Sequence, residues 1–288
     1  MKLRKITMLM ACAISAPALA WTNGDFNGNV DIGGSITPEQ YSQSWQWESG
    51  TDLNNFVNSV QQMTDGFKKL DITADKNYLI LRGTTTAAIF AGPGEGAVPN
   101  IAFSDYEGNS VSLNQDTSAD QGTGYFELPI KDDSNKKLGT LRVNATAAGL
   151  LVGGYNGKPS YVSLKATNSN HAFYGGLFGK VMADGNTANA LMNIFALPEK
   201  NALWRQIKAH PNIDPAIASK ASMARTTWSM FGVFNSTTKT SVNYMQAPAA
   251  ASYAMGVKTG QLLNATFDNP ITSTTKWSAP LNIAVTYN

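Results

Sequence analysis

The chain has 288 residues, with 22 basic and 20 acidic side chains and a formal net charge of +2. A chain of this length can build its own hydrophobic core. Because its positive and negative charges nearly balance, the chain has no electrostatic basis for binding nucleic acid. A single cysteine excludes a disulfide framework and a structural zinc site of the usual Cys/His kind.

The first 20 residues read as a secretory signal peptide. Basic residues at positions 2, 4 and 5 precede an apolar stretch over 6–14, and Ala18-Leu19-Ala20 has the small-x-small pattern of a cleavage site. Cleavage there leaves 268 residues (288 − 20) beginning at Trp21, with 19 basic and 20 acidic side chains and a net charge of −1. The mature protein is therefore expected to be exported and to contain no cysteine.

Cys12 allows an alternative, because a cysteine that follows a small residue is sometimes a lipid-attachment site. Cleavage before Cys12 would leave a very short apolar core and would ignore the Ala18-x-Ala20 pattern. The cleavage site after Ala20 is favoured.

The mature chain opens with an alternating stretch over residues 25–36. Its large apolar side chains and two of its glycines share one parity, and polar residues occupy most of the other: Phe26, Gly28, Val30, Ile32, Gly34 and Ile36. Alternation with period two predicts an extended strand with one apolar face. No turn folds this strand back onto a neighbour, which favours pairing with another molecule's sheet. An ordinary half-buried first strand remains the alternative.

Short strands separated by turn signals follow in chain order, and Leu53–Met63 is read as a loop with a helical turn. Strands are predicted at 44–48, 69–73, 78–82, 101–103, 111–113, 125–130 and 138–143, and the chain ends in an alternating strand over 281–287. Many short strands at this spacing predict a mainly β protein with a sandwich architecture.

The pattern becomes helical in the segment 153–246. Leu191, Met192 and Phe195 share one face of a helix expected from Thr187. Pro198 is suited to begin a second helix, which Pro211 would end, and its apolar side comprises Leu203, Trp204 and Ile207. A short third helix over 214–219 and a strand over 241–244 follow. We interpret 153–246 as an insertion that decorates the sandwich.

The sequence lacks the usual signatures of catalysis and metal binding. It contains no G-x-S-x-G elbow, P-loop or H-E-x-x-H motif, and its two histidines, His171 and His210, are isolated. Asp25-x-Asn27-x-Asn29 resembles the start of a calcium loop, but Val30 and Ile36 occupy the positions that need glycine and glutamate. We therefore expect no enzyme activity, no cofactor and no metal. Two carboxylates that meet in space, as in a glycosidase, remain an alternative.

Several stretches of the mature chain resemble the FaeG-type fimbrial subunits of enteric bacteria. The similarity lies at both ends and at internal sites: Trp21-Thr22-Asn23-Gly24-Asp25-Phe26-Asn27-Gly28, Asp31-Ile32-Gly33-Gly34-Ser35-Ile36-Thr37, Phe103-Ser104-Asp105-Tyr106-Glu107-Gly108, Val143-Asn144-Ala145, Phe173-Tyr174-Gly175-Gly176 and Trp277-Ser278-Ala279-Pro280-Leu281-Asn282. The resemblance implies assembly by the chaperone–usher pathway. It also implies an incomplete immunoglobulin-like sandwich, over residues 38–288, that is completed by a donor strand.

In this scheme residues 21–37 form an N-terminal extension that enters the groove of a neighbouring subunit. The inward residues of the donor strand would be Phe26, Gly28, Val30, Ile32, Gly34 and Ile36. The C-terminal strand would line the groove, and a periplasmic chaperone would grip it, through Leu281, Ile283, Val285 and Tyr287. The expected partners are other fimbrial subunits, the chaperone, an outer-membrane usher and a host glycoconjugate, and the expected location is the cell surface.

The resemblance further implies receptor binding by the inserted segment. Sugar-binding members place ligand residues just before the Phe173-Tyr174-Gly175-Gly176 stretch, yet Leu164–His171 does not reproduce their aromatic and acidic set. Asn168, Asn170 and His171 are candidates to bind sugar hydroxyls, and Trp204 or Trp228 to stack on a sugar ring. The alternative places Trp204 in the core and makes the Asn/Ser run an ordinary loop. A minor subunit without receptor binding and a secreted glycan-processing enzyme are the rival functions.

Overall fold

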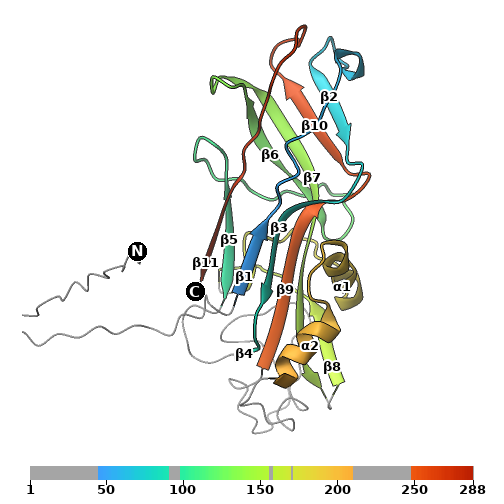
Figure 1. Ribbon diagram of the computed structural model, residues 1–288, viewed down its shortest axis with the longest axis vertical. Coiled ribbons are helices and arrows are strands. Elements are labelled where there is room, and N and C mark those ends of the chain that lie inside the picture. Colours follow the sequence, from blue (N-terminus) through green and yellow to red (C-terminus); the bar gives the residue numbers. More distant parts are fainter. Residues whose placement is uncertain (1–44, 91–97, 156–157, 170, 210–247, 288) are drawn as a thin grey trace, which may run out of the picture. The chain divides into compact units, whose positions relative to one another are not determined.

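The computed structural model describes residues 45–90, 98–155, 158–169, 171–209 and 248–287, all of which lie in the unit Gln40–Asn288 (Figure 1). The predicted signal peptide and donor strand lie outside these residues. The elements are β1 (Trp45–Ser49), a 3₁₀ turn η2 (Val60–Gln62), β2 (Lys69–Thr73), β3 (Tyr78–Thr85), β4 (Ile89–Phe90), β5 (Pro99–Ser104), β6 (Thr123–Lys131), β7 (Lys137–Tyr155), β8 (Lys158–Ser163), α1 (Gly185–Ile194), α2 (Lys200–Ala209), β9 (Pro248–Val257), β10 (Leu262–Phe267) and β11 (Asn282–Tyr287).

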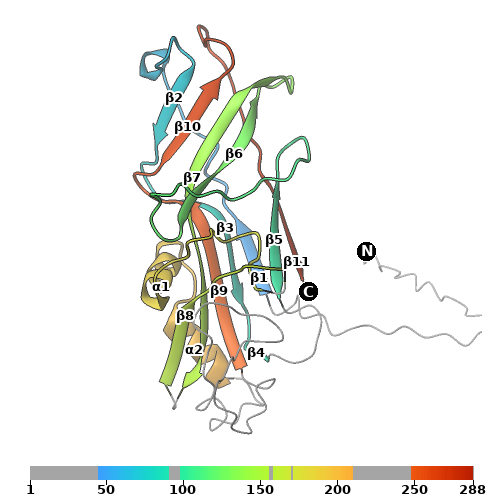
Figure 2. The same cartoon turned by 180° about the vertical axis from the view of Figure 1, so that it is seen from behind.

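The protein is mainly β, as predicted, and its larger sheet is built around β7. The first half of this 19-residue strand pairs with β6 along one edge and β10 along the other, and its second half pairs with β9 and β8. The main path of the nine-stranded sheet has the order β1-β3-β9-β7-β10-β2. Figure 2 shows the same sheet from behind, with β5 and β11 beside it.

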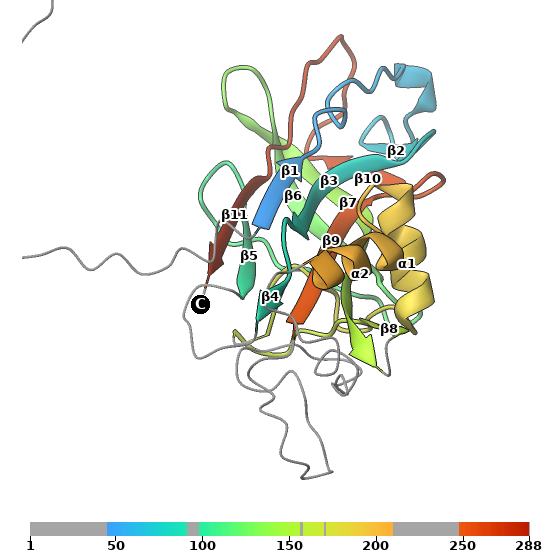
Figure 3. The same ribbon diagram turned by 60° about the horizontal axis from the view of Figure 1, so that its bottom comes forward.

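The two halves of β7 differ in burial because they have different neighbours. Leu141, Val143 and Ala145 alternate with partly exposed residues, as expected for a strand with one apolar face. From Ala145 to Val152 every residue is buried, since α1 and α2 pack on the second face of the sheet. Figure 3 shows both helices lying against this face. A strand covered on both faces loses the period-two signal, so the prediction stopped at Val143.

A smaller sheet of β5 and β11 completes an immunoglobulin-like sandwich. The two strands pair antiparallel, with Ile283 opposite Phe103 and Val285 opposite Ile101. The inward side chains of both strands pack on the same core cluster as those of β3, β6 and β7. The last strand therefore contributes to the core across the sandwich and is separate from the larger sheet.

The helix predictions are right in position and differ slightly at their starts. The first helix begins at Gly185, two residues before the expected Thr187, because the Asp184 carboxylate caps it by accepting hydrogen bonds from the backbone N–H groups of Asn186 and Thr187. The second helix begins at Lys200 and not at Pro198. The backbone N–H of Lys200 donates a hydrogen bond to the side chain of Asn189 on the first helix. The expected residues Leu203, Trp204 and Ile207 form its buried side.

Other sequence predictions had mixed outcomes. The helical turn expected within 53–63 is the 3₁₀ turn at Val60–Gln62. The prediction of a strand at Val111–Leu113 is wrong. Only isolated β-bridges flank this segment. The strands β8, β9 and β10 were not predicted. Three predictions fall outside the described residues: the third helix over 214–219, the strand over 241–244 and the end of the second helix at Pro211. The extent of the insertion, 153–246, stays a prediction.

Membrane-spanning helices and metal-binding clusters are both absent from the described residues. Neither α1 nor α2 is long and apolar enough to cross a membrane, and the rest of the described chain contains no such helix. The same part of the chain contains no group of three or more His, Cys, Asp or Glu side chains placed to hold a metal ion.

Candidate functional site: a groove between the first and last described strands

The groove begins with two strand edges that have no neighbouring strand among the described residues. Within the described chain, β11 pairs with β5 along one edge only, and β1 pairs with β3 along one edge only. The unpaired N–H and C=O groups of such edges are a template for an additional strand. The architecture therefore has two free edges on opposite sides of the same core.

The inward side chains of β11 are incompletely covered. Ile283, Val285 and Tyr287 point toward the core, as their parity predicted, but each is only half-buried. On the adjacent strand β5, the corresponding Ile101 and Phe103 are 3% and 4% exposed. Since both strands belong to the same small sheet, the difference shows that cover is missing on the side of β11 away from β5.

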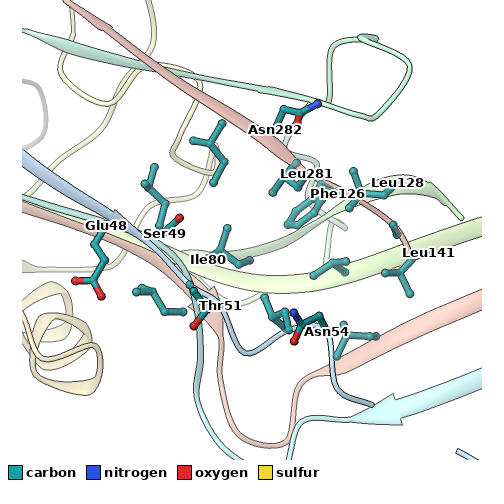
Figure 4. A pocket seen from close by; sticks show the side chains of 18 of the residues that line it. Glu48, Ser49, Thr51, Asn54, Ile80, Phe126, Leu128, Leu141, Leu281 and Asn282 are labelled. Atoms are coloured by element: carbon teal, nitrogen blue, oxygen red, sulfur yellow. The ribbon is translucent and has the colours of Figure 1, made fainter. Parts of the chain in front are cut away.

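A cavity of about 710 Å³ lies in this position (Figure 4). Its walls come from β1 and the segment after it, β3, β6, β7, β10 and the end of the chain. Most of the residues that line the cavity have apolar side chains. These apolar residues are Trp47, Leu53, Leu79, Ile80, Leu81, Phe126, Leu128, Leu141, Val143, Leu263, Ala279, Leu281, Ile283 and Val285. Leu281, Ile283 and Val285 line this cavity and Tyr287 does not; their role in donor-strand and chaperone binding stays a prediction.

Among the described residues that line the groove, Glu48 is the one carboxylate. Its Oε2 accepts hydrogen bonds from Nε and Nη2 of Arg82, at 2.9 and 2.6 Å. Nη1 of Arg82 also donates to the backbone oxygen of Phe195, at the end of α1. The lining therefore offers no pair of carboxylates for glycosidase chemistry.

A second cavity, of about 590 Å³, lies between β8 and the segment that leads into α1. Tyr161, Ser163 and Lys165 line one side, and residues 179–185 line the other. Ser163 is 4% exposed, and its hydroxyl has no hydrogen-bond partner among the described residues. A buried hydroxyl without a partner is uncommon in folded proteins. Sequence reasoning missed this cavity, because no local pattern distinguishes Ser163.

Three of the residues proposed for sugar binding, Asn168, His171 and Trp204, lie among the described residues. Trp204 is 9% exposed and packs in the cluster beneath the helices, which fits the core alternative. Nδ1 of His171 accepts a hydrogen bond from the backbone N–H of Thr167, and its Nε2 lies 3.3 Å from Nδ2 of Asn168. Asn170 and Trp228 lie outside the described residues.

The Phe173-Tyr174-Gly175-Gly176 stretch has a structural role that the sequence did not predict. The backbone N–H of Phe173 donates to the oxygen of Pro99, and that of Ile101 donates to the oxygen of Tyr174. The stretch thus covers the edge of β5 that faces away from β11. Gly175 adopts φ +82°, and a Cβ there would lie 2.1 Å from the backbone oxygen of Ile101, so both conformation and space require glycine.

This geometry defines a class of protein. Its members are mainly β and have an open groove beside the last strand. The chain belongs to the family "Fimbrial, major and minor subunit", whose model matches residues 1–288. It is 40% identical over 292 residues to K88 fimbrial protein AD of Escherichia coli, covering 97% of this chain and 96% of that protein. K88 fimbrial protein AB of the same organism is 40% identical over 290 residues, with 97% and 96% covered.

A shorter match is the K88 minor fimbrial subunit FaeI of Escherichia coli. It is 27% identical over 168 residues, which cover 56% of this chain and 63% of that protein. Membership of the family identifies the chain as a structural subunit of a surface fimbrium that polymerises with other fimbrial subunits.

Proposed function

We propose that this subunit polymerises by donor-strand exchange, in which residues 21–37 of one copy fill the groove between β1 and β11 of the next. The observation that carries the proposal is the half-buried row Ile283, Val285 and Tyr287 beside an unpaired strand edge. An inserted strand would pair with both free edges and would cover this row with alternate side chains.

The opening strand has the composition that such a groove requires. Phe26, Val30, Ile32 and Ile36 share one parity, and each contributes about 1.5–3 kcal/mol if it is fully buried. The gross stabilisation is therefore roughly 6–12 kcal/mol per junction, before the cost of ordering the strand. A junction of this kind would dissociate slowly. Before polymerisation, a periplasmic chaperone would occupy the same groove and deliver the subunit to an outer-membrane usher.

The test is an unboiled denaturing gel of fimbriae sheared from cells that carry the whole assembly operon. The intact protein should give a ladder of multiples, and a variant lacking Trp21–Ile36 should not. A lone monomer band from the intact protein would contradict donor-strand exchange. The number of copies per fimbria distinguishes a repeating subunit from a minor one, and the shorter, weaker match to a minor subunit favours the repeating role.

Adhesion to a host glycoconjugate is the second function that we propose, and the cavity between β8 and α1 favours it. The partly exposed ring of Tyr161 and the exposed cation of Lys165 line this cavity, and the unpartnered hydroxyl of Ser163 is buried in its wall. An aromatic face with a few polar groups is the usual lining of a pocket for a small polar ligand.

Replacing Lys165 by alanine is expected to weaken adhesion of fimbriated cells to immobilised host glycolipids by about tenfold, since one hydrogen bond to the ligand is lost. Protein stability should stay nearly the same, because the Lys165 side chain is exposed. Lys136→Ala, in the exposed turn after β6, is the matched control. Unchanged adhesion in the Lys165 variant would assign this cavity no part in receptor binding.

A further inference from the structure

A side-chain hydrogen bond joins the two strands that flank the groove. Nε1 of Trp47, on β1, donates to the hydroxyl oxygen of Tyr287, at the end of β11, with a distance of 2.8 Å. Both side chains point inward and belong to the core cluster or pack against it. The bond therefore spans the space between β1 and β11, where the proposed donor strand would lie.

Trp47 is the fixed partner of this pair. Its ring stacks on Trp45 at 5.8 Å between ring centroids and meets the edge of Phe173 at 6.3 Å. Gly83 lies against its other side, where a Cβ would be 2.3 Å from the ring. These contacts hold the partly buried indole on the sides away from the groove, and its N–H points toward β11.

Tyr287 is the partner that can move. It is half-buried, at the last described position of a strand paired along one edge, and strand ends of this kind open most readily. Burial raises the pKa of its hydroxyl, against the opposing effect of the bond from Trp47. The hydroxyl is thus protonated at neutral pH and accepts the indole N–H through its lone pairs.

The bond marks one end of the groove. Near the end of the chain the apolar lining residues are Leu281, just before β11, and Ile283 and Val285 on β11, and on the other wall the lining runs from Trp47 to Asn54. Because Trp47 contacts Tyr287, β1 lies beside the end of β11. The opposite end of the groove therefore lies near Asn54 and Leu281. A donor strand that extends along all of β11 places an inward side chain at the level of this hydrogen bond, where the two would compete for the same space.

We infer that the Trp47–Tyr287 hydrogen bond is a clasp that closes one end of the groove and limits the rate at which a donor strand enters. The inference rests on the proposed donor-strand function. Trp47 and Tyr287 are then positioning residues for strand exchange. The bond keeps β11 close to β1 while the groove is empty, and the arriving strand must displace the tyrosine to occupy the full length.

The test uses the full-length mature protein and a fluorescently labelled synthetic peptide of residues 21–37 as the donor. Tyr287→Phe removes the acceptor and keeps the ring, and Trp47→Phe removes the donor N–H. Loss of one hydrogen bond corresponds to a rate increase of about 3- to 10-fold in peptide uptake. The double variant should be no faster than the faster single variant, because both remove the same bond. Tyr78→Phe, whose hydroxyl donates to Asp75 away from the groove, is the matched control.

Each outcome separates the two claims. Uptake by the wild type and faster uptake by both single variants supports the clasp. Equal or slower uptake by the variants, with melting temperatures near that of the wild type, overturns the clasp and leaves donor-strand exchange standing. No uptake by any of the proteins, including the control, overturns donor-strand exchange and the clasp with it.

Discussion

Replacing Ile32 by aspartate should abolish polymerisation while leaving the complex with the chaperone intact. Ile32 lies at the centre of the apolar parity of the opening strand, and its burial contributes about 1.5–3 kcal/mol to a junction. An aspartate there must also be buried without a partner, which adds a further cost of several kcal/mol. The combined loss corresponds to at least a hundredfold weaker junction. The chaperone complex should survive, because in the proposed scheme the chaperone supplies its own strand to the groove.

The measurement is the ladder on an unboiled gel, together with co-purification of the subunit with its chaperone. Ser35→Asp is the matched control, because it adds the same charge to the same strand at the opposite parity, which should face outward. The control should polymerise. Normal fimbriae from the Ile32 variant would show that this strand is not the donor, and loss of polymerisation in both variants would show that charge, not parity, is responsible.

The sequence predicted the parts of the fold that keep a one-sided pattern. The alternation in β2, β6 and β11 is visible in the letters because each of these strands has one covered face. The second half of β7 and the alanine-rich β9 were missed for the opposite reason. From Ala250 to Val257 every residue of β9 is buried, because the core lies on one face and the helices on the other, so no alternation remains.

The candidate site could be predicted only in part, for a similar physical reason. One wall of the groove is a continuous strand, so Leu281, Ile283 and Val285 were identifiable from their parity. The opposite wall combines Trp47, Leu79 and Phe126 from β1, β3 and β6, and no local pattern indicates that these strands meet. The bond from Trp47 to Tyr287 joins residues 240 positions apart. Contacts of this kind depend on the tertiary fold and leave no trace in neighbouring residues.

Replacing Ile283 by aspartate should have a broader effect than the Ile32 substitution. Ile283 lies at the middle of the half-buried row of β11 and lines the groove. A carboxylate in this position keeps partial contact with water while the groove is empty but becomes buried without a partner when any strand fills it. The chaperone and the neighbouring subunit would therefore both bind poorly, and we expect neither the gel ladder nor a stable chaperone complex.

Ala284 provides the matched control for Ile283, since it is the next residue on the same strand and its side chain is exposed on the outer face. Ala284→Asp should keep both the ladder and the chaperone complex. Ile283→Ala, which costs about 1 kcal/mol of apolar contact and introduces no charge, should weaken assembly without abolishing it, and this graded result separates a binding defect from misfolding. Normal polymerisation of the Ile283→Asp variant would rule out this groove as the acceptor. Loss of polymerisation in the Ile32 variant alone would then mean that the donor strand binds elsewhere on its neighbour.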